Sequence, residues 1–416
     1  MRRLALFVIV TALLVAAAVW LADRPGQVVI HWQGWRLDTT VPVLVLALAS
    51  LALKLVRAII GFPRHVLANR QARRTRDGYR ALSDGLAAIA SGDPRRARKL
   101  ARRADKLLED RSLTGLLTAQ AAELSGDESD AERRFTTMVE RPETAFLGLK
   151  GLLALAQKRG EQGAALDYAH RAWALGGPTD GIAATLFDLQ ARAGQWPEAE
   201  ATLMEAKKRG AMSNGDVLHA RALVLLERSR VTADPAEAVK LTLSAHKADS
   251  GFVPAATQTA ALFHRLGKPR KAESVIATTW RINPHPDLVE ASMALAPAET
   301  PLQRVKRVEK LVRANPDSPD GHMALAEAAL AAKLWGQART HLQAALAERP
   351  TGGLYVLLAK LEREETQDEA AAQAWLAKST TAPAEPAWVC TKCNKSADSW
   401  SVTCPHCGTV DGLVWK

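Results

Sequence analysis

The four cysteines of this 416-residue chain lie together near its C-terminus, in the stretch CTKCNKSADSWSVTCPHCG. They form two Cys-x2-Cys pairs separated by ten residues, at Cys390, Cys393, Cys404 and Cys407. Four thiolates on two such turns can surround one ion tetrahedrally, with zinc–sulfur bonds of about 2.3 Å. The spacing therefore predicts a metal site with four cysteine ligands.

The ligand types do not distinguish zinc from iron, because both ions accept four tetrahedral thiolates. We favour zinc, since nothing else in the sequence indicates electron transfer. Four thiolates also fill every position, whereas a catalytic zinc keeps one open. Two alternatives are His406 in place of one cysteine, and a regulatory haem site at the dipeptide formed by Cys404 and Pro405.

Residues 388–416 are too few to hold a hydrophobic core unaided, so metal binding is expected to supply their folding free energy. Trp388, Trp400 and Trp415 surround the cysteine pairs and are expected to form a small core. The preceding stretch TTAPAEPA, residues 380–387, is rich in proline and small residues. Its composition predicts a linker.

Two apolar runs at the other end of the chain predict a membrane anchor over residues 1–63. Residues 4–22 carry no charge, and residues 41–60 carry only Lys54 and Arg57, which can reach the interface. A bilayer crossing needs roughly 20 apolar residues. A cleaved signal peptide is the alternative for the first run, although its apolar part is normally about 7–15 residues long.

Charges beside the runs set the expected topology. The loop between them, GQVVIHWQGWRLDTT, has a pattern typical of a hairpin around Gln33 and Gly34. Basic residues follow the second run at Arg64, His65, Arg70, Arg73, Arg74 and Arg76. The positive-inside rule then predicts a multi-pass protein of a bacterial inner membrane with both termini cytoplasmic and a short periplasmic loop. A reducing cytoplasm argues against disulfides between the cysteines.

The net charge of +11 allows either nucleic acid or anionic lipid as a partner. Basic residues just inside a membrane span are expected for topology and for attraction to lipid headgroups. We therefore predict membrane lipid as a partner and no nucleic acid.

A 34-residue period runs through residues 64–379. Small residues follow a glycine at a fixed distance, and the alanines recur at Ala97, Ala131, Ala165 and Ala199. The phase slips by five residues at Ala238 and recovers at Ala272, and a later unit has Ala338. This period is typical of the tetratricopeptide repeat, and about eight units fit.

Each unit is expected to be a helix hairpin with glycine at its turn and a small residue where the two helices approach closely. Stacked hairpins form a superhelix whose concave groove binds proteins. Aromatic residues make up only 5% of the chain against 48% hydrophobic residues, which also favours helices. The sequence predicts an all-α solenoid; a non-repetitive helical bundle is the alternative.

Motifs of known catalytic sites are missing from the sequence: it has no phosphate-binding loop, dinucleotide fingerprint, nucleophile elbow or His-Glu-x2-His pair. We therefore predict that the protein is not an enzyme.

The two runs, the loop PGQVVIHWQGWRLDTTVPVLVLAL, the basic stretch and the repeats together resemble the HemY family of proteobacterial inner-membrane proteins. This resemblance implies a scaffold that recruits cytoplasmic proteins, with haem-biosynthesis enzymes as the expected partners. The cysteine tail is also similar to that of the lipopolysaccharide-assembly protein LapB, which has one span where this chain has two. A LapB-like regulatory adaptor and a direct haem or porphyrin binder, using Cys404 or His264, are the alternatives. The flavin fingerprint of the oxidase that shares the HemY name is missing, so that activity is not implied.

Overall fold

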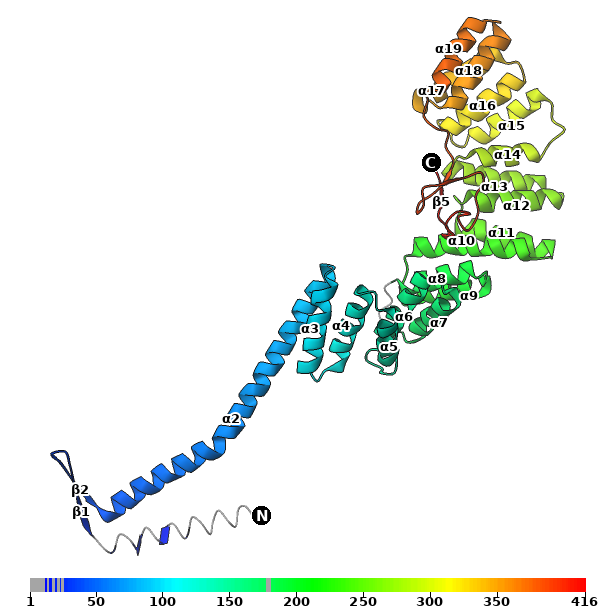
Figure 1. The fold of residues 1–416 in the computed structure, drawn as a ribbon. Helices are drawn as coiled ribbons and strands as arrows, with labels where there is room; N and C mark the ends of the chain where they lie inside the picture. The colour runs from blue at the N-terminus through cyan, green and yellow to red at the C-terminus, as the bar shows by residue number, and fades with distance from the viewer. Residues whose placement is uncertain (1–11, 13–14, 17–18, 21–22, 24–25, 177–180) are drawn as a thin grey trace. The chain divides into compact units, whose positions relative to one another are not determined.

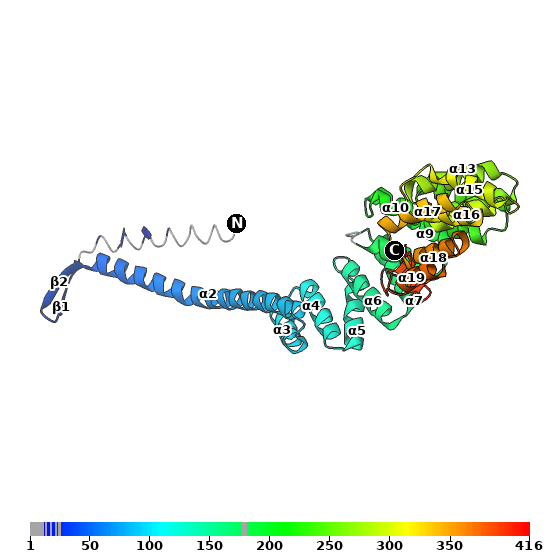
Figure 2. The same cartoon turned by 90° about the horizontal axis from the view of Figure 1, so that it is seen from above.

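The computed structural model describes residues 12, 15–16, 19–20, 23, 26–176 and 181–416. The chain divides into two compact units, residues 1–138 and 139–416. Within each unit the helices follow one another in sequence order (Figure 1 and Figure 2). Most of the first predicted span, residues 4–22, lies outside the described residues.

The predicted hairpin in the loop is confirmed. Strands β1 (Gln27–Trp32) and β2 (Trp35–Thr40) pair antiparallel. The two loop residues have left-handed backbone angles, with φ of 47° at Gln33 and 87° at Gly34. A two-residue loop of this kind matches the twist of the flanking strands, and glycine adopts the second position without strain.

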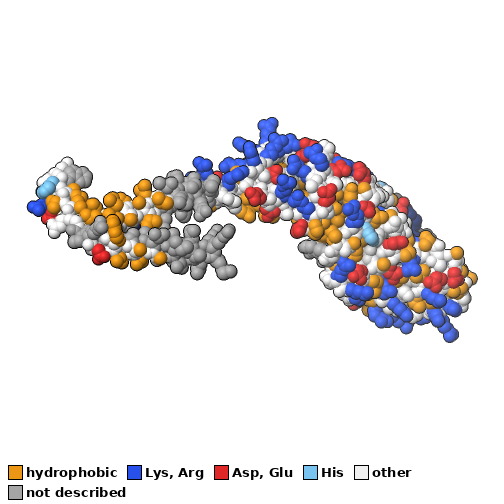
Figure 3. Space-filling view, turned by 90° about the horizontal axis from the view of Figure 1, so that it is seen from below, with side chains coloured by type: hydrophobic (Ala, Val, Ile, Leu, Met, Phe, Trp, Pro, Cys, Tyr) orange, Lys and Arg blue, Asp and Glu red, His pale blue; other side chains and the backbone are white. Residues whose placement is uncertain are grey.

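Helix α2 (Val41–Ala90) begins at the first residue of the second predicted span and continues without a break past its predicted end at residue 60. Its first described turns carry hydrophobic side chains without protein cover, and basic side chains gather farther along the unit (Figure 3). Within the part of the chain that the structure describes, no helix has the length and apolarity that a membrane crossing needs.

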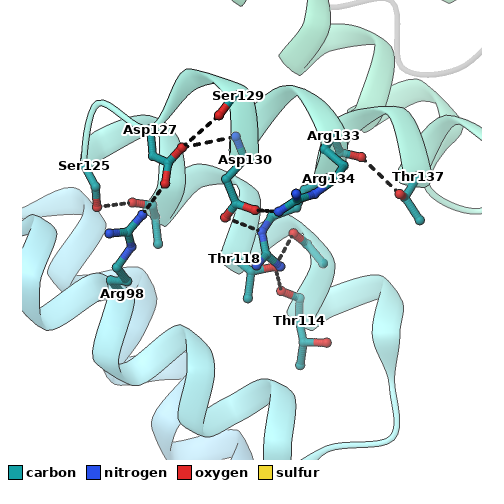
Figure 4. A network of polar contacts seen from close by, with 12 residues as sticks. Arg98, Thr114, Thr118, Ser125, Asp127, Ser129, Asp130, Arg133, Arg134 and Thr137 are labelled. Carbon is teal, nitrogen blue, oxygen red and sulfur yellow. Dashed lines mark hydrogen bonds and ion pairs between the residues drawn. The ribbon is translucent and has the colours of Figure 1, made fainter.

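A polar network organises the rest of the first unit (Figure 4). The unit continues with α3 (Pro94–Leu107), α4 (Arg111–Leu124) and α5 (Glu128–Val139). Arg98 on α3 pairs with Asp127 at 2.7 Å, and Asp127 accepts the backbone N–H of Asp130 at 3.2 Å. Asp130 in turn accepts from Arg134 at 2.8 Å. Hydrogen bonds from the N–H of Asp130 and from Arg98 hold the pKa of Asp127 below its usual value, so a charged carboxylate caps α5.

In the second unit, the described residues 139–176 and 181–416 form fourteen helices and a small sheet from α6 onward. The helices are α6 (Ala145–Arg159), α7 (Gln162–Ala174), α8 (Ile182–Arg192), α9 (Trp196–Arg209), α10 (Asn214–Val231), α11 (Pro235–Ala248), α12 (Val253–Arg265), α13 (Pro269–Ile282), α14 (Pro286–Ala294), α15 (Pro301–Val312), α16 (Pro319–Ala331), α17 (Trp335–Glu348), α18 (Gly352–Glu365) and α19 (Glu369–Ser379). Even-numbered helices are the first helices of successive hairpins, and odd-numbered helices are the second.

The predicted repeat geometry is confirmed. The period alanines all lie on second helices and are buried, at Ala97, Ala131, Ala165, Ala199, Ala238, Ala272 and Ala338. The glycines at the turns have φ between 67° and 76°, at Gly92, Gly126, Gly160, Gly194 and Gly267. These angles are left-handed, which glycine adopts without strain.

The eighteen helices from α2 to α19 form nine consecutive pairs, one more than the eight expected. The turn between α18 and α19 has Gln367, at φ 54°, in the left-handed position, so the glycine signature is missing there. The poorly matching unit is α14 and α15, where α14 has only nine residues. Its buried Leu288 nonetheless joins a core with Trp280 and Ile276 of the preceding pair.

The C-terminal sheet has the strand order β4–β3–β5 and is antiparallel throughout. Its strands are β3 (Trp388–Cys390), β4 (Ser396–Ala397) and β5 (Leu413–Trp415). Trp388 pairs with Ala397 on one side and with Trp415 on the other. We call residues 388–416 the ribbon and residues 380–387 the linker.

Candidate metal centre and its seat on the repeats

The structure brings the four predicted cysteines together. The sulfur atoms of Cys390 and Cys407 lie 3.6 Å apart, and those of Cys393 and Cys404 lie 3.7 Å apart. All four lie within 4.8 Å of one another, and none forms a disulfide. A tetrahedron with bonds of about 2.3 Å to zinc has edges of about 3.8 Å. The four thiols could therefore hold a single metal ion.

Hydrogen bonds favour the thiolate form, which a metal needs, at two of the four cysteines. The Thr409 hydroxyl, 3.2 Å from the sulfur, and the Thr409 amide lower the pKa of Cys407 to about 6. The backbone N–H groups of Cys393 and Lys392 lower the pKa of Cys390. Thiolates are the metal-binding species, so these donors prepare Cys390 and Cys407 for a cation. The N–H of Lys395 lowers the pKa of Cys393, but burial and hydrogen bonds with the other thiols outweigh it and raise that pKa to about 11, so a metal ion would have to displace this proton.

His406 does not join the cluster. Its imidazole is exposed, and Nε2 lies 3.2 Å from the backbone oxygen of Ser396. Cys404 is buried among the other thiols. His264 is exposed in the last turn of α12, so the two residues considered for haem lie in different environments. The candidate ligand set is thus four cysteines, which can fix a structure but leave no position open for substrate.

The ribbon packs against the repeats of the second unit, beside α10–α14 (Figure 1). Its contacts involve the first helices of three successive hairpins, α10, α12 and α14, or the residues that directly precede them. One contact is a charged joint around His219 of α10. Its Nδ1 lies 2.6 Å from Asp249, which precedes α12, and its Nε2 lies 3.0 Å from Asp411 of the ribbon. Hydrogen bonds to Asp249 and Asp411 raise the pKa of His219 to about 10, so it is a cation held between two carboxylates.

A second contact is aromatic. Trp400 of the ribbon meets Phe252 edge-on, with ring centroids 5.2 Å apart. The Arg230 guanidinium lies over the Trp400 ring at 5.6 Å, and Phe252 also meets the His219 ring at 5.1 Å. These rings join the charged joint to the apolar core between α10 and α12. Such pairs contribute about 0.5–1.5 kcal/mol beyond the area they bury.

A third contact encloses His285, which caps α14 by accepting the N–H of Asp287 at 3.1 Å. Its ring stacks on Trp388 at 5.1 Å and lies 4.3 Å from Trp415. The side chain is 1% exposed, and burial lowers its pKa, so His285 is neutral. The tryptophans predicted to form a small core do so with Cys390 and Leu413. The structure adds that they also cover a histidine of the repeats.

Sequence reasoning missed His219, Asp249, Phe252, His285 and Asp411 as a docking set. Isolated histidines, acids and a phenylalanine on helices carry no spacing signature, and the partners lie far apart in the chain. The predicted linker also makes a fixed contact, because the Glu385 carboxylate accepts the N–H of Gly353 at the start of α18.

Comparison with known proteins gives one family and one whole-length relative. A family model described as the N-terminus of the HemY protein matches residues 26–126. The probable magnetosome protein Mms48 of Magnetospirillum gryphiswaldense is 30% identical over 440 residues, which span 99% of this chain and 93% of the relative.

Solved structures give weaker likenesses. A tetratricopeptide-repeat protein from Parabacteroides merdae is 16% identical, covers 60% of this chain and 93% of its own, and has a TM-score of 0.28. The TPR2AB domain of yeast Sti1 in complex with pHSP90 is 14% identical, covers 73% and 98% respectively, and has a TM-score of 0.26. These scores are low, so the fold assignment rests on the hairpins of the chain itself.

Proposed function

The chain belongs to the family of HemY-type tetratricopeptide-repeat proteins, and from this premise we propose that it is an inner-membrane scaffold that recruits cytoplasmic proteins. One observation carries the proposal: the same chain has exposed apolar side chains at the start of α2 and an array of stacked helix hairpins. Repeat arrays of this kind expose long surfaces suited to protein partners.

Membrane attachment is proposed through spans over residues 4–22 and 41–60 in an anchor formed by residues 1–63. Most large apolar side chains at the start of α2 are exposed, for example Leu46 at 63% and Leu51 at 58%. A contiguous apolar surface of this kind indicates contact with lipid or protein. The basic residues that follow favour cytoplasmic placement of both termini and attraction to anionic lipid.

The proposed partners are haem-biosynthesis enzymes, and the scaffold itself is proposed to be non-enzymatic. Anchoring two binding partners to one membrane protein raises their effective concentration toward each other. This would favour transfer of poorly soluble porphyrins between successive enzymes. Residues 64–379 would supply the binding surface.

We further propose that Cys390, Cys393, Cys404 and Cys407 bind one structural zinc, with iron as the alternative. The sulfur separations fit a tetrahedral ion, and the amide and hydroxyl donors favour thiolate. The metal would hold the ribbon, residues 388–416, in the shape that rests on the repeats. Metal content and the visible spectrum of the purified chain would separate colourless zinc from coloured iron.

Co-purification from membranes solubilised in detergent tests the scaffold proposal. The tagged full-length chain should retain haem-pathway enzymes, and a chain lacking residues 64–379 should lose them. Enrichment of other proteins with no haem-pathway enzyme would contradict the proposal.

The name of the whole-length relative favours a second candidate. Because Mms48 is described as a probable magnetosome protein, this chain is also a candidate scaffold for magnetosome proteins. The same co-purification decides between the two, since magnetosome proteins would then replace haem-pathway enzymes among the retained partners. A LapB-like adaptor would instead change the lifetime of an envelope enzyme when the chain is depleted.

A further inference from the structure

An open pocket of about 570 Å³ lies on the second unit, between α14, α16 and the junction of linker and ribbon. Val289 and Met293 of α14 and Met323 and Ala328 of α16 give it an apolar floor. Pro386 and Trp415 form a wall on the other side. The volume falls within the range of about 300–1,000 Å³ that is usual for binding sites.

The pocket is acidic although the chain as a whole is basic. Five carboxylates line it against two guanidinium groups, a difference of three negative charges in a chain of net charge +11. Both guanidinium groups are engaged: Arg349 pairs with Asp320, and Arg304 donates to the backbone oxygen of Pro297 at 3.1 Å.

Among the described residues, two of the five carboxylates, Glu290 and Glu327, have neither an ion pair nor a hydrogen bond. By contrast, Asp320 has Arg349 and Glu385 has the N–H of Gly353. Desolvation by the surrounding protein raises the pKa of Glu327 above its usual value. Both side chains are exposed, and Lys360 acts on Glu327 only from beyond ion-pair distance, so a cation brought to the pocket can pair with both carboxylates.

We infer that this pocket binds a basic segment of a partner protein. The aliphatic stem of an arginine or lysine would lie on Val289, Met293 and Met323, and its cation would meet Glu290 and Glu327. Long basic side chains combine an apolar stem with a charged head in this way. The inference rests on the proposed recruitment of proteins by the repeats and specifies the chemistry of one binding surface.

The same charges define what the pocket rejects. Acidic peptides and the carboxylate groups of porphyrins would meet like charge at Glu290 and Glu327, which disfavours binding. The direct haem or porphyrin binder considered from the sequence is therefore not supported at this pocket. The ribbon is part of the site, because Trp415 forms its wall, so an intact cysteine cluster is expected to be needed for full affinity.

The test uses the full-length chain in non-ionic detergent and a fluorescein-labelled hexapeptide in which arginine alternates with leucine, read by fluorescence anisotropy. The variant Glu290→Gln/Glu327→Gln should bind the peptide at least tenfold more weakly than the unmodified chain. The matched control Glu143→Gln/Glu348→Gln removes two exposed carboxylates outside the pocket and should bind within twofold. A hexapeptide with glutamate in place of arginine should not bind. Equal weakening in both variants, or no binding of the arginine peptide, would overturn the inference.

Co-purification with the same variants separates this inference from the proposed function. If the unmodified chain and Glu290→Gln/Glu327→Gln retain the same partners in equal amounts, the scaffold stands and the pocket assignment is overturned. If the unmodified chain retains no partner while the arginine peptide still binds as expected, the pocket stands and the proposed scaffold is overturned.

Discussion

The repeat hairpins and the ribbon lie side by side in residues 139–416, but they are stabilised in different ways. Each hairpin buries small residues, such as Ala165 and Ala199, against helices adjacent in sequence. The ribbon has a small core of its own, built around Cys390 and Leu413. It depends on a candidate metal cluster and on contacts with helices far away in the chain.

Because of this difference, the interactions that fold the ribbon are separate from those that hold it against the repeats. Nearest-neighbour packing stabilises each hairpin locally, so the array can tolerate changes in one unit. We propose that metal binding to the cluster folds the ribbon, and polar and aromatic contacts such as His219 with Asp411 and Trp400 with Phe252 position it. Breaking the cluster should therefore unfold the ribbon, whereas breaking a contact should only release it.

The largest expected effect is that of Cys393→Ala. Structural zinc sites contribute apparent binding free energies of about 10–16 kcal/mol, so losing one ligand should release the metal and unfold the ribbon. Tryptophan emission should shift to the red while far-UV circular dichroism stays nearly unchanged. Thr391→Ala, at an exposed position between the first two cysteines, is the matched control and should keep the metal. A large loss of helix would mean that the ribbon also stabilises the array.

This contrast also explains what the sequence could predict. The hairpins were predictable because contacting helices are separated by a constant number of residues, which leaves a visible period in the alanines. The count was one pair short of the nine observed, and glycine is replaced at two of the later turns, by Lys333 before α17 and by Gln367 before α19. Residue spacing in the sequence therefore predicts contacts between helices that are neighbours along the chain.

The candidate cluster was predictable for the same reason, since ligand spacing within each turn is local. The position of the ribbon on the repeats was not predictable, because His219 and Asp411 meet only after the superhelix has formed. The linker illustrates the limit: its prolines predict a spacer, but Glu385 caps the start of α18 at Gly353. Contacts between distant residues of ordinary type leave no pattern in a single sequence.

Overpacking within the array should have the next largest effect. Ala199 is fully buried on α9, and Ala201 on the same helix is exposed. Ala199→Leu should lower the free energy of unfolding by about 1–3 kcal/mol, because extra methyl groups force neighbouring helices apart. Ala201→Leu should change it by less than about 0.5 kcal/mol. Thermal unfolding followed by circular dichroism measures both, and equal effects would contradict close helix packing at Ala199.

The charged joint should make ribbon docking sensitive to pH. The pKa of His219 is raised from 6.5 to about 10, so its contribution is fully present below about pH 6.5 and is lost as pH rises through about 10. Asp249 stays beside His219 when the ribbon dissociates from the repeats. Only the interaction of His219 with Asp411 therefore contributes to the free energy of docking. Both side chains of that pair are about one-third exposed, and we expect an effect of about 1 kcal/mol.

Hydrogen exchange of the ribbon amides at several pH values would measure this release. Asp411→Asn should weaken docking below pH 6.5 and flatten its pH dependence, while the metal content stays constant. Asp398→Asn changes an exposed ribbon carboxylate away from the joint and should leave the dependence unchanged. Identical pH profiles for both variants would show that His219 and Asp411 do not control docking.

The smallest expected effect belongs to an ion pair within the array. Arg339 on α17 donates to Glu362 at 2.7 Å and to Glu365 at 2.5 Å, both on α18. The helices already pack through Leu342 and Leu358, and the ion pair is partly exposed, so Arg339→Ala should cost only about 0.5–1 kcal/mol at low salt. The difference should shrink in high salt, because screening weakens exposed charges. Thermal unfolding at two salt concentrations measures it; a cost above that of Ala199→Leu would mean that charge, rather than close packing, holds neighbouring hairpins together.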